Sequence, residues 1–324
     1  LVGKFLIFSL KLYNQVAPRG YFEMAYEKVW EEIEFFSNDL KTAAYLYKPK
    51  DWNPGDPPRP GITVLHGYTG MKDVYGMDVP QWLWEEGYFV LSFDYPGFGV
   101  SEGERGRHRP LDQAQSVYDA VTYLQTVDGV DPSRIAYYGS SYGGAHAIWC
   151  GAFDERVKVI VSAVMVSNGE RWMKSVRRPH EWQDFKEKVD EAERKRVLTG
   201  EKTMVPLVEI MLTDPHTQMV VEQFHAKSGR FNPEYDLESA AANIRYKPEW
   251  VAHRISPRPV LMIYAEFDNL VPIEEQISCY EALGEPKKLV KLPDAQHYES
   301  YQFCNAEIHE IQKVETLEWY RKYL

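Results

Sequence analysis

The sequence Gly139-Ser140-Ser141-Tyr142-Gly143 most strongly constrains the fold, because it follows a strand-like run and precedes a helix-like one. Arg134 to Tyr138 is typical of a short buried strand, and the residues after Gly144 favour a helix. In such a context, small residues on both sides of a serine let the backbone turn sharply and expose the hydroxyl. Ser141 is therefore predicted to be a nucleophile. Because the pattern also occurs in ordinary glycine-rich turns, the prediction needs further residues that activate a serine.

Strand-like and helix-like segments alternate along most of the chain. Strands are expected at residues 29–36, 42–47, 61–66, 88–94, 134–140, 157–164, 259–265 and 288–292. Helices are expected at 79–86, 111–126, 141–152, 273–283 and 308–323. The first two strands predict an antiparallel hairpin, and the later ones are continuous apolar runs, as in strands buried on both faces. The pattern predicts an α/β fold with an eight-stranded, mostly parallel sheet flanked by helices.

Residues 166–257 interrupt this alternation, because helix formers and charged residues dominate there without a convincing strand. We therefore expect a core at 29–165 and 258–324, a helical cap inserted at 166–257, and an N-terminal helical segment at 1–28. The run Leu1 to Leu10 is short and contains Lys4, so it predicts a segment that packs on the domain and not a membrane span.

Charge and cysteine content exclude several classes of partner. The formal net charge of −11 argues against a nucleic-acid partner, which would need a basic surface. The three cysteines are widely spaced and predict neither a disulfide framework nor a zinc site, which favours a reducing, cytoplasmic location. The expected partner is a small-molecule substrate, and assembly into a homo-oligomer stays open. No metal or organic cofactor is implied.

A serine hydroxyl needs a base to remove its proton and a third group to orient that base. His297 follows the last predicted strand, in a loop at the same edge of the sheet as Ser141, and is the best candidate base. Asp268 follows the preceding strand and is the best candidate acid, which gives the order Ser, Asp, His along the chain. Glu266 and Asp294 are the rival acids. Asp268 has a competing interpretation as a cap of the helix after Pro272, and His297 as an ordinary loop residue.

Acyl transfer also requires hydrogen-bond donors for the negative charge that develops on the carbonyl oxygen. The backbone N–H of Tyr142, directly after the predicted nucleophile, is expected to be one donor. The loop after the third strand, His66 to Gly70, is expected to supply the backbone N–H of Tyr68 as the second. His66 itself is predicted to be a structural residue at the end of the strand. The competing interpretation of this loop is a simple glycine turn.

These residues resemble the α/β-hydrolase superfamily, and more narrowly the branch that contains Xaa-Pro dipeptidyl peptidases, cocaine-type esterases and dienelactone-hydrolase-like proteins. The resemblance runs from about residue 30 to the end apart from the cap, and it is carried by His66-Gly67, Asp94 to Gly103, Gly139 to Gly144, Asp268 with Pro272, and His297. It implies that Ser141, Asp268 and His297 form a catalytic triad, that Tyr68 and Tyr142 form the oxyanion hole, and that Asp94 to Gly103 is architectural. The chain lacks room for the additional domains of the peptidases, which weakens the case for an Xaa-Pro peptidase.

The expected function is that of a serine hydrolase, carboxylesterase-like, which cleaves an ester-like acyl bond of a small, largely apolar substrate through an acyl-enzyme intermediate. Alternatives with the same residues are hydrolysis of a carbon–carbon bond in a diketone or ring-cleavage product, acyl or polyketide transfer, and thioester hydrolysis. A peptidase or a non-catalytic binding module is less favoured. Substrate contacts are expected in the cap, from large apolar side chains that also suit a cap core: Trp172, Trp182, Phe185, Met204, Met211 and Phe224.

Overall fold

The computed structural model describes residues 27–74 and 77–324, except for the side chains of residues 223–227. The predicted N-terminal segment therefore lies outside the described residues, apart from its last two positions. Among the described residues, no helix is both long and apolar enough to cross a bilayer.

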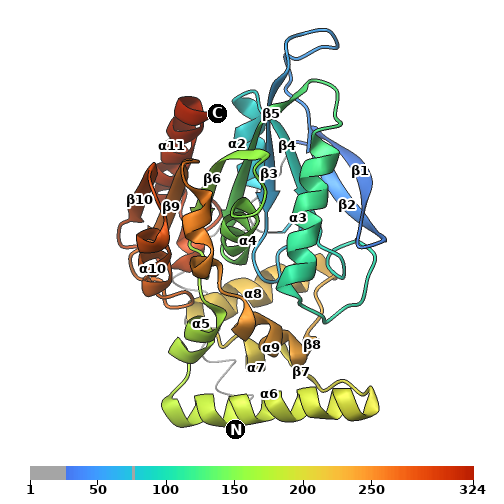
Figure 1. Cartoon of the computed structure of the whole chain (residues 1–324), viewed down its shortest axis with the longest axis vertical. Coiled ribbons are helices and arrows are strands. Elements are labelled where there is room, and N and C mark those ends of the chain that lie inside the picture. Colours follow the sequence, from blue (N-terminus) through green and yellow to red (C-terminus); the bar gives the residue numbers. More distant parts are fainter. Residues whose placement is uncertain (1–26, 75–76) are drawn as a thin grey trace.

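One eight-stranded sheet organises the core (Figure 1). Its order is β1-β2-β4-β3-β5-β6-β9-β10, with β1 antiparallel to β2, β2 antiparallel to β4, and the remaining neighbours parallel. This confirms the predicted α/β fold class. The strand bounds are β1 Trp30–Ser37, β2 Leu40–Tyr47, β3 Arg59–Leu65, β4 Phe89–Phe93, β5 Val130–Ser140, β6 Val157–Ala163, β9 Val260–Ala265 and β10 Lys287–Leu292.

Helices cover both faces of this sheet. One face packs against α3 (Pro110–Leu124), α4 (Tyr142–Gly151) and α10 (Glu274–Ala282), and the other against α2 (Asp78–Glu85) and α11 (Ala306–Tyr323). Strand β5 shows the consequence, because Ile135 and Tyr137 pack on one face while Ala136 and Tyr138 pack on the other. Alternate residues thus enter different core clusters, which explains why the central strands are apolar at nearly every position.

The predicted cap region gathers below the core in Figure 1. It contains α5 Gly169–Ser175, α6 Pro179–Thr199, α7 Leu207–Ile210, α8 Pro215–Ser228 and α9 Glu238–Arg245, followed by the 3-10 helices η1 Pro248–Trp250 and η2 Ala252–Ile255. The expectation that this region lacks strands is wrong, because β7 (Met204–Pro206) pairs antiparallel with β8 (Glu234–Asp236). Each strand has only three residues, which is too short to produce an alternating pattern in the sequence.

Ion pairs join this region to the core. Arg109, just before α3, makes two bonds of 2.9 and 2.7 Å to the buried carboxylate of Asp236 in β8. Arg171 in α5 bridges Glu249 in η1 and Glu275 in α10, at 2.7 and 2.6 Å. Burial raises the pKa of Glu275, while the hydrogen bond from Arg171 opposes that shift. Arg230 also pairs with Asp73 (2.7 Å) and Lys202 with Glu104, so the predicted cap region is held to the core at several separate points.

Asp94, at the end of β4, connects two loops at the edge of the sheet. Its carboxylate accepts bonds from the backbone N–H and the Nζ of Lys72, both at 2.7 Å, and from the N–H of Val100 at 3.0 Å. Both side chains of the ion pair are buried. Gly99 has a φ of +52°, and a Cβ there would lie 2.0 Å from Asp94 Oδ2, so the site requires glycine. This arrangement gives the Asp94 to Gly103 motif a structural role.

We expect Asp94→Ala to lower the free energy of unfolding by about 3–5 kcal/mol, because it leaves the Lys72 ammonium buried without its carboxylate. Urea unfolding followed by circular dichroism measures this change. The matched control is Asp51→Ala, which removes an exposed pair with Arg59 and should change the free energy of unfolding much less than Asp94→Ala does. Equal, small effects of both substitutions would contradict a structural role for Asp94.

Candidate active site

Ser141 occupies a strained turn between β5 and α4. Its backbone angles are φ +57° and ψ −124°, a region that non-glycine residues rarely adopt. The N–H of Ser141 donates to the carbonyl of Ala163 at the end of β6 (2.8 Å), and its own carbonyl accepts from Gly144 (3.0 Å). These bonds fix the turn, so the hydroxyl emerges where the parallel strands end.

The glycines around Ser141 are required by close backbone approaches. A Cβ on Gly139 would lie 2.2 Å from the carbonyl oxygen of Gly143, and a Cβ on Gly143 would lie 2.1 Å from that of Leu65. Gly67 faces the serine itself, because a Cβ there would lie 3.1 Å from Ser141 Cβ. The turn can therefore pack against the end of β3 only with glycine at positions 139 and 143, and at position 67 a larger residue would crowd Ser141.

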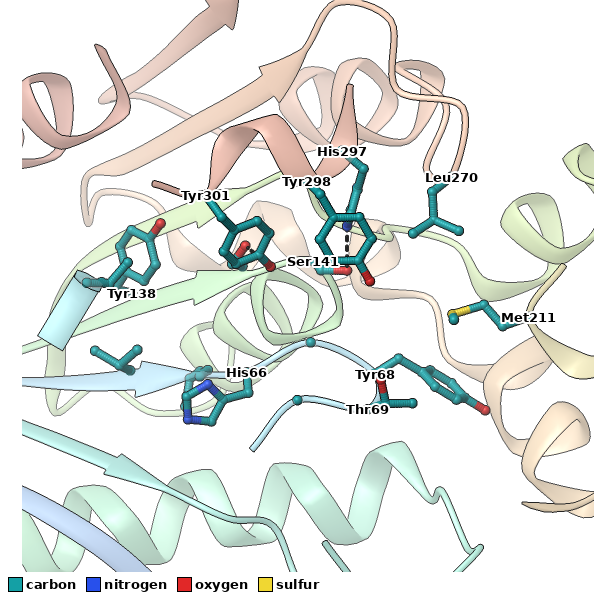
Figure 2. A pocket seen from close by; sticks show the side chains of 16 residues that line it. His66, Tyr68, Thr69, Tyr138, Ser141, Met211, Leu270, His297, Tyr298 and Tyr301 are labelled. Carbon is teal, nitrogen blue, oxygen red and sulfur yellow. Dashed lines mark hydrogen bonds between the residues drawn. The ribbon is translucent and has the colours of Figure 1, made fainter. Parts of the chain in front are cut away.

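The structure brings the predicted base and acid to Ser141, and Figure 2 shows the base beside the serine. Nε2 of His297 lies 3.1 Å from Ser141 Oγ, and its Nδ1 lies 2.7 Å from Asp268 Oδ2. His297 begins the 3-10 helix η3 (His297–Ser300) after β10, and Asp268 follows β9. His297 and Asp268 are both buried. With its proton on Nδ1, the imidazole donates to Asp268 and accepts from the Ser141 hydroxyl.

The second oxygen of Asp268 stabilises its own loop. Oδ1 accepts bonds from the N–H groups of Leu270 (3.0 Å) and Val271 (2.7 Å). The carboxylate is therefore not a cap of α10, whose N-cap residue is Ile273 and has no side-chain cap bond. The rival Glu266 instead pairs with Lys291 at 2.7 Å, and the hydrogen bond from Lys291 lowers the pKa of Glu266.

Asp294 is not the acid that contacts His297 either. It is exposed, and its N–H donates to Glu266 at 3.1 Å. Of the three carboxylates weighed from the sequence, Asp268 is the one within hydrogen-bonding distance of His297.

The loop after β3 passes next to Ser141. The N–H of Gly70 donates to the carbonyl of Gly67 (3.0 Å), which closes a tight turn around Tyr68. In Figure 2 the phenol of Tyr68 points away from Ser141. Its hydroxyl accepts a bond from Asn243 Nδ2 in α9 (3.2 Å), and its ring stacks on His108 with centroids 4.0 Å apart. The Tyr68 hydroxyl is thus already bonded to the cap, which leaves the backbone of this loop to face the serine.

The buried imidazoles near this loop are held in neutral surroundings. Burial lowers the pKa of His66 to about 4, and its Nε2 lies 2.9 Å from Ser92 Oγ. Burial also lowers the pKa of His108 well below its ordinary value. Both are therefore uncharged at neutral pH, which suits ring stacking and local hydrogen bonding.

A pocket of about 40 Å³ surrounds Ser141 and His297. Of the residues predicted to contact the substrate, Met211 lines this pocket. Figure 2 shows its side chain between Leu270 and Tyr68. The sequence analysis missed other lining residues, namely Val79, Tyr138, Leu270, Tyr298 and Tyr301. Because Tyr298 directly follows the predicted base His297, the sequence could have indicated that it lies at the site. Nothing in the sequence indicates that Val79 in α2 reaches this pocket.

Several of the predicted substrate-contact residues do not line this pocket. Trp172 is buried and donates from Nε1 to the carbonyl of Leu270 (2.8 Å), and Trp182 packs against Phe185 in α6, so these side chains belong to the cap core. Met204 is 44% exposed and does not line this pocket. The side chain of Phe224 lies outside the described residues. Cap-core and pocket-lining residues have the same apolar character, so composition alone does not separate them.

The site contains no arrangement for a metal among the residues that the structure describes, where no three His, Cys, Asp or Glu side chains gather around a possible ion position.

Comparison with known proteins places this geometry in a family. A family model described as "Serine aminopeptidase, S33" matches residues 56–298, which include the loop after β3, Ser141, Asp268 and His297. The chain is 27% identical to thiohydrolase aneE of Aspergillus aculeatus over 84% of this chain and 87% of that protein. It is also 27% identical to polyketide transferase grgF of a Penicillium species over 80% of this chain and 86% of that protein.

The solved structures agree on the fold. The crystal structure of the α/β hydrolase GrgF from Penicillium superposes with a TM-score of 0.74 at 24% identity, covering 91% of this chain and 98% of that one. The narrower branch named from the sequence stays a prediction. Because the family model matches well over half of the 324 residues, the chain belongs to the α/β hydrolases of the serine aminopeptidase S33 family.

Proposed function

We propose that this α/β hydrolase is a serine hydrolase that cleaves an ester-like acyl bond of a small, largely apolar substrate. The observation that carries the proposal is the continuous hydrogen-bonded path from Ser141 Oγ through His297 to Asp268. A serine, a histidine and a carboxylate in this order supply a nucleophile, a base and a group that orients the base. Together they have the chemistry that acyl transfer needs.

In the proposed reaction, His297 Nε2 accepts the hydroxyl proton as Ser141 Oγ attacks the substrate carbonyl. The backbone N–H groups of Tyr68 and Tyr142 donate to the oxyanion that forms. His297 then donates the proton to the leaving oxygen or sulfur, which departs and leaves an acyl group on Ser141. Water, deprotonated by His297, attacks this acyl group and releases the acid and the free serine. Asp268 holds the imidazole and stabilises its protonated form throughout.

The relatives support a second candidate, which is transfer of an acyl group from a thioester. One relative is named a thiohydrolase and another a polyketide transferase. The same side chains serve both outcomes, since the acyl group on Ser141 can pass to water or to another nucleophile. Hydrolysis of a carbon–carbon bond in a diketone is the remaining alternative from the sequence. A panel of p-nitrophenyl esters, acyl thioesters and diketones, with and without an alcohol acceptor, separates these reactions.

We expect Ser141→Ala to reduce kcat by roughly 10⁴-fold or more, because it removes the attacking oxygen. Asp268→Asn should also lower kcat strongly, since it disturbs the imidazole tautomer that accepts the serine proton. Rates on p-nitrophenyl butyrate measure both effects, and labelling with a fluorophosphonate reports whether Ser141 is activated. As a control, each variant should give the same unfolding curve as the wild-type protein. With peptide amides added to the substrate panel, a peptidase would instead favour these amides, and a non-catalytic scaffold would leave Ser141 unlabelled.

Tyr68→Phe tests which atoms of Tyr68 take part. If the backbone N–H is the donor, removing the phenol hydroxyl should change kcat less than about ten-fold, because the amide remains. If the hydroxyl were the donor, kcat should fall by about 10²–10³-fold. Asn243→Ala, which removes the partner of that hydroxyl, is the matched control. A loss of 10²-fold or more with Tyr68→Phe alone would overturn the assignment of the backbone amide.

A further inference from the structure

A second cavity lies in the cap beside the pocket at Ser141. It has a volume of about 240 Å³ and is lined by residues of β7, α7 and α8 and of the segment just before β8. We call it the cap cavity and define it by its main apolar residues, Leu207, Val208, Met211, Val221 and Phe231. The polar side chains that reach it, among them Gln218 and the exposed Glu222, are few. Such a lining favours an uncharged, apolar ligand.

Met211 lies between the two spaces, because it lines both the cap cavity and the pocket at Ser141. In Figure 2 it lies on the opposite side of Ser141 from Tyr138, between Leu270 and Tyr68. The N–H of Met211 donates to the carbonyl of Leu207 (2.9 Å), so the two residues sit one turn apart along the wall of the cap cavity. A methionine side chain is unbranched and adaptable, and it can shift without the strain that a branched residue would incur.

The volumes of the two spaces indicate which part of a substrate each of them can hold. About 40 Å³ at Ser141 holds only a few atoms, enough for a carbonyl and its immediate neighbours. The cap cavity is about six times larger and has room for a chain of several methylene groups. Each methylene that it removes from water should strengthen binding by roughly four-fold. Glu222 at its edge disfavours a chain that ends in a carboxylate.

We propose that the cap cavity binds the apolar tail of the acyl group whose carbonyl lies at Ser141, so that the favoured substrates are esters or thioesters of unbranched acyl chains of medium length. This inference rests on the proposed function. It names a substrate class, and it makes Val208 and its neighbours in the cap cavity the residues that determine chain-length preference.

Val208 offers a direct test, since its side chain is 51% exposed and a larger one can be introduced there without displacing the core. Val208→Trp should fill part of the cap cavity. The matched control is Val197→Trp, at a 71% exposed position in α6 that lines neither the cap cavity nor the pocket at Ser141. The quantity measured is the ratio of kcat/KM for p-nitrophenyl decanoate to kcat/KM for p-nitrophenyl acetate, at concentrations where neither ester aggregates.

We expect Val208→Trp to lower this ratio by at least ten-fold, and Val197→Trp to leave it within two-fold of wild type. A ratio that is the same in both variants would overturn the inference while leaving the proposed function intact. If no ester is turned over, the proposed function fails, and calorimetric binding of decanoic acid still tests the cavity. There, Val208→Trp should raise the dissociation constant at least ten-fold relative to Val197→Trp, and equal dissociation constants would overturn the inference.

Discussion

The turn at Ser141 is the constraint on which the rest of the site depends. The serine holds a positive φ, and backbone carbonyls approach Gly139 and Gly143 so closely that only glycine fits at these two positions. An isolated chain would not keep such a conformation, because it costs on the order of 1–3 kcal/mol. Here the ends of β3 and β6 hold it, the latter through the bond from Ser141 N–H to Ala163. The strain is thus sustained by the packed sheet, and the hydroxyl is positioned before any substrate arrives.

Carboxylates stabilise the loops that surround this turn. Asp94 uses its two oxygens to fix the loop after β3 and the loop after β4, and Asp268 uses one oxygen for its own loop and the other for His297. A buried carboxylate needs several donors to offset its lost hydration, and loop N–H groups supply them here. The same bonds that satisfy these charges therefore determine where the loops lie, so that loop geometry and the orientation of His297 are set together.

The sequence predicted the core well because its signals are local. Each central strand is an apolar run ended by glycine or polar residues, and Ser141, Asp268 and His297 follow strands whose carboxyl ends must share one edge. The cap was predicted less well. Its strands β7 and β8 have three residues each, and the side chains of Trp172, Trp182 and Phe185 fill the cap core although they resemble pocket residues in character. Which apolar side chain faces a cavity depends on how helices pack, and a single sequence does not carry that information.

The contacts of Tyr68 join the cap to the reacting centre. Its hydroxyl is bonded to Asn243 in α9, and its ring stacks on His108. The backbone of His108 is held in turn, because its N–H donates to the hydroxyl of Ser239, also in α9 (2.9 Å). Arg109 extends the connection through its two bonds to Asp236. The loop beside Ser141 therefore has the cap as one of its supports. A side-chain change that moves α9 would displace the partners of Tyr68 directly, so the position of the amide proposed to stabilise the oxyanion depends on how α9 packs against this loop.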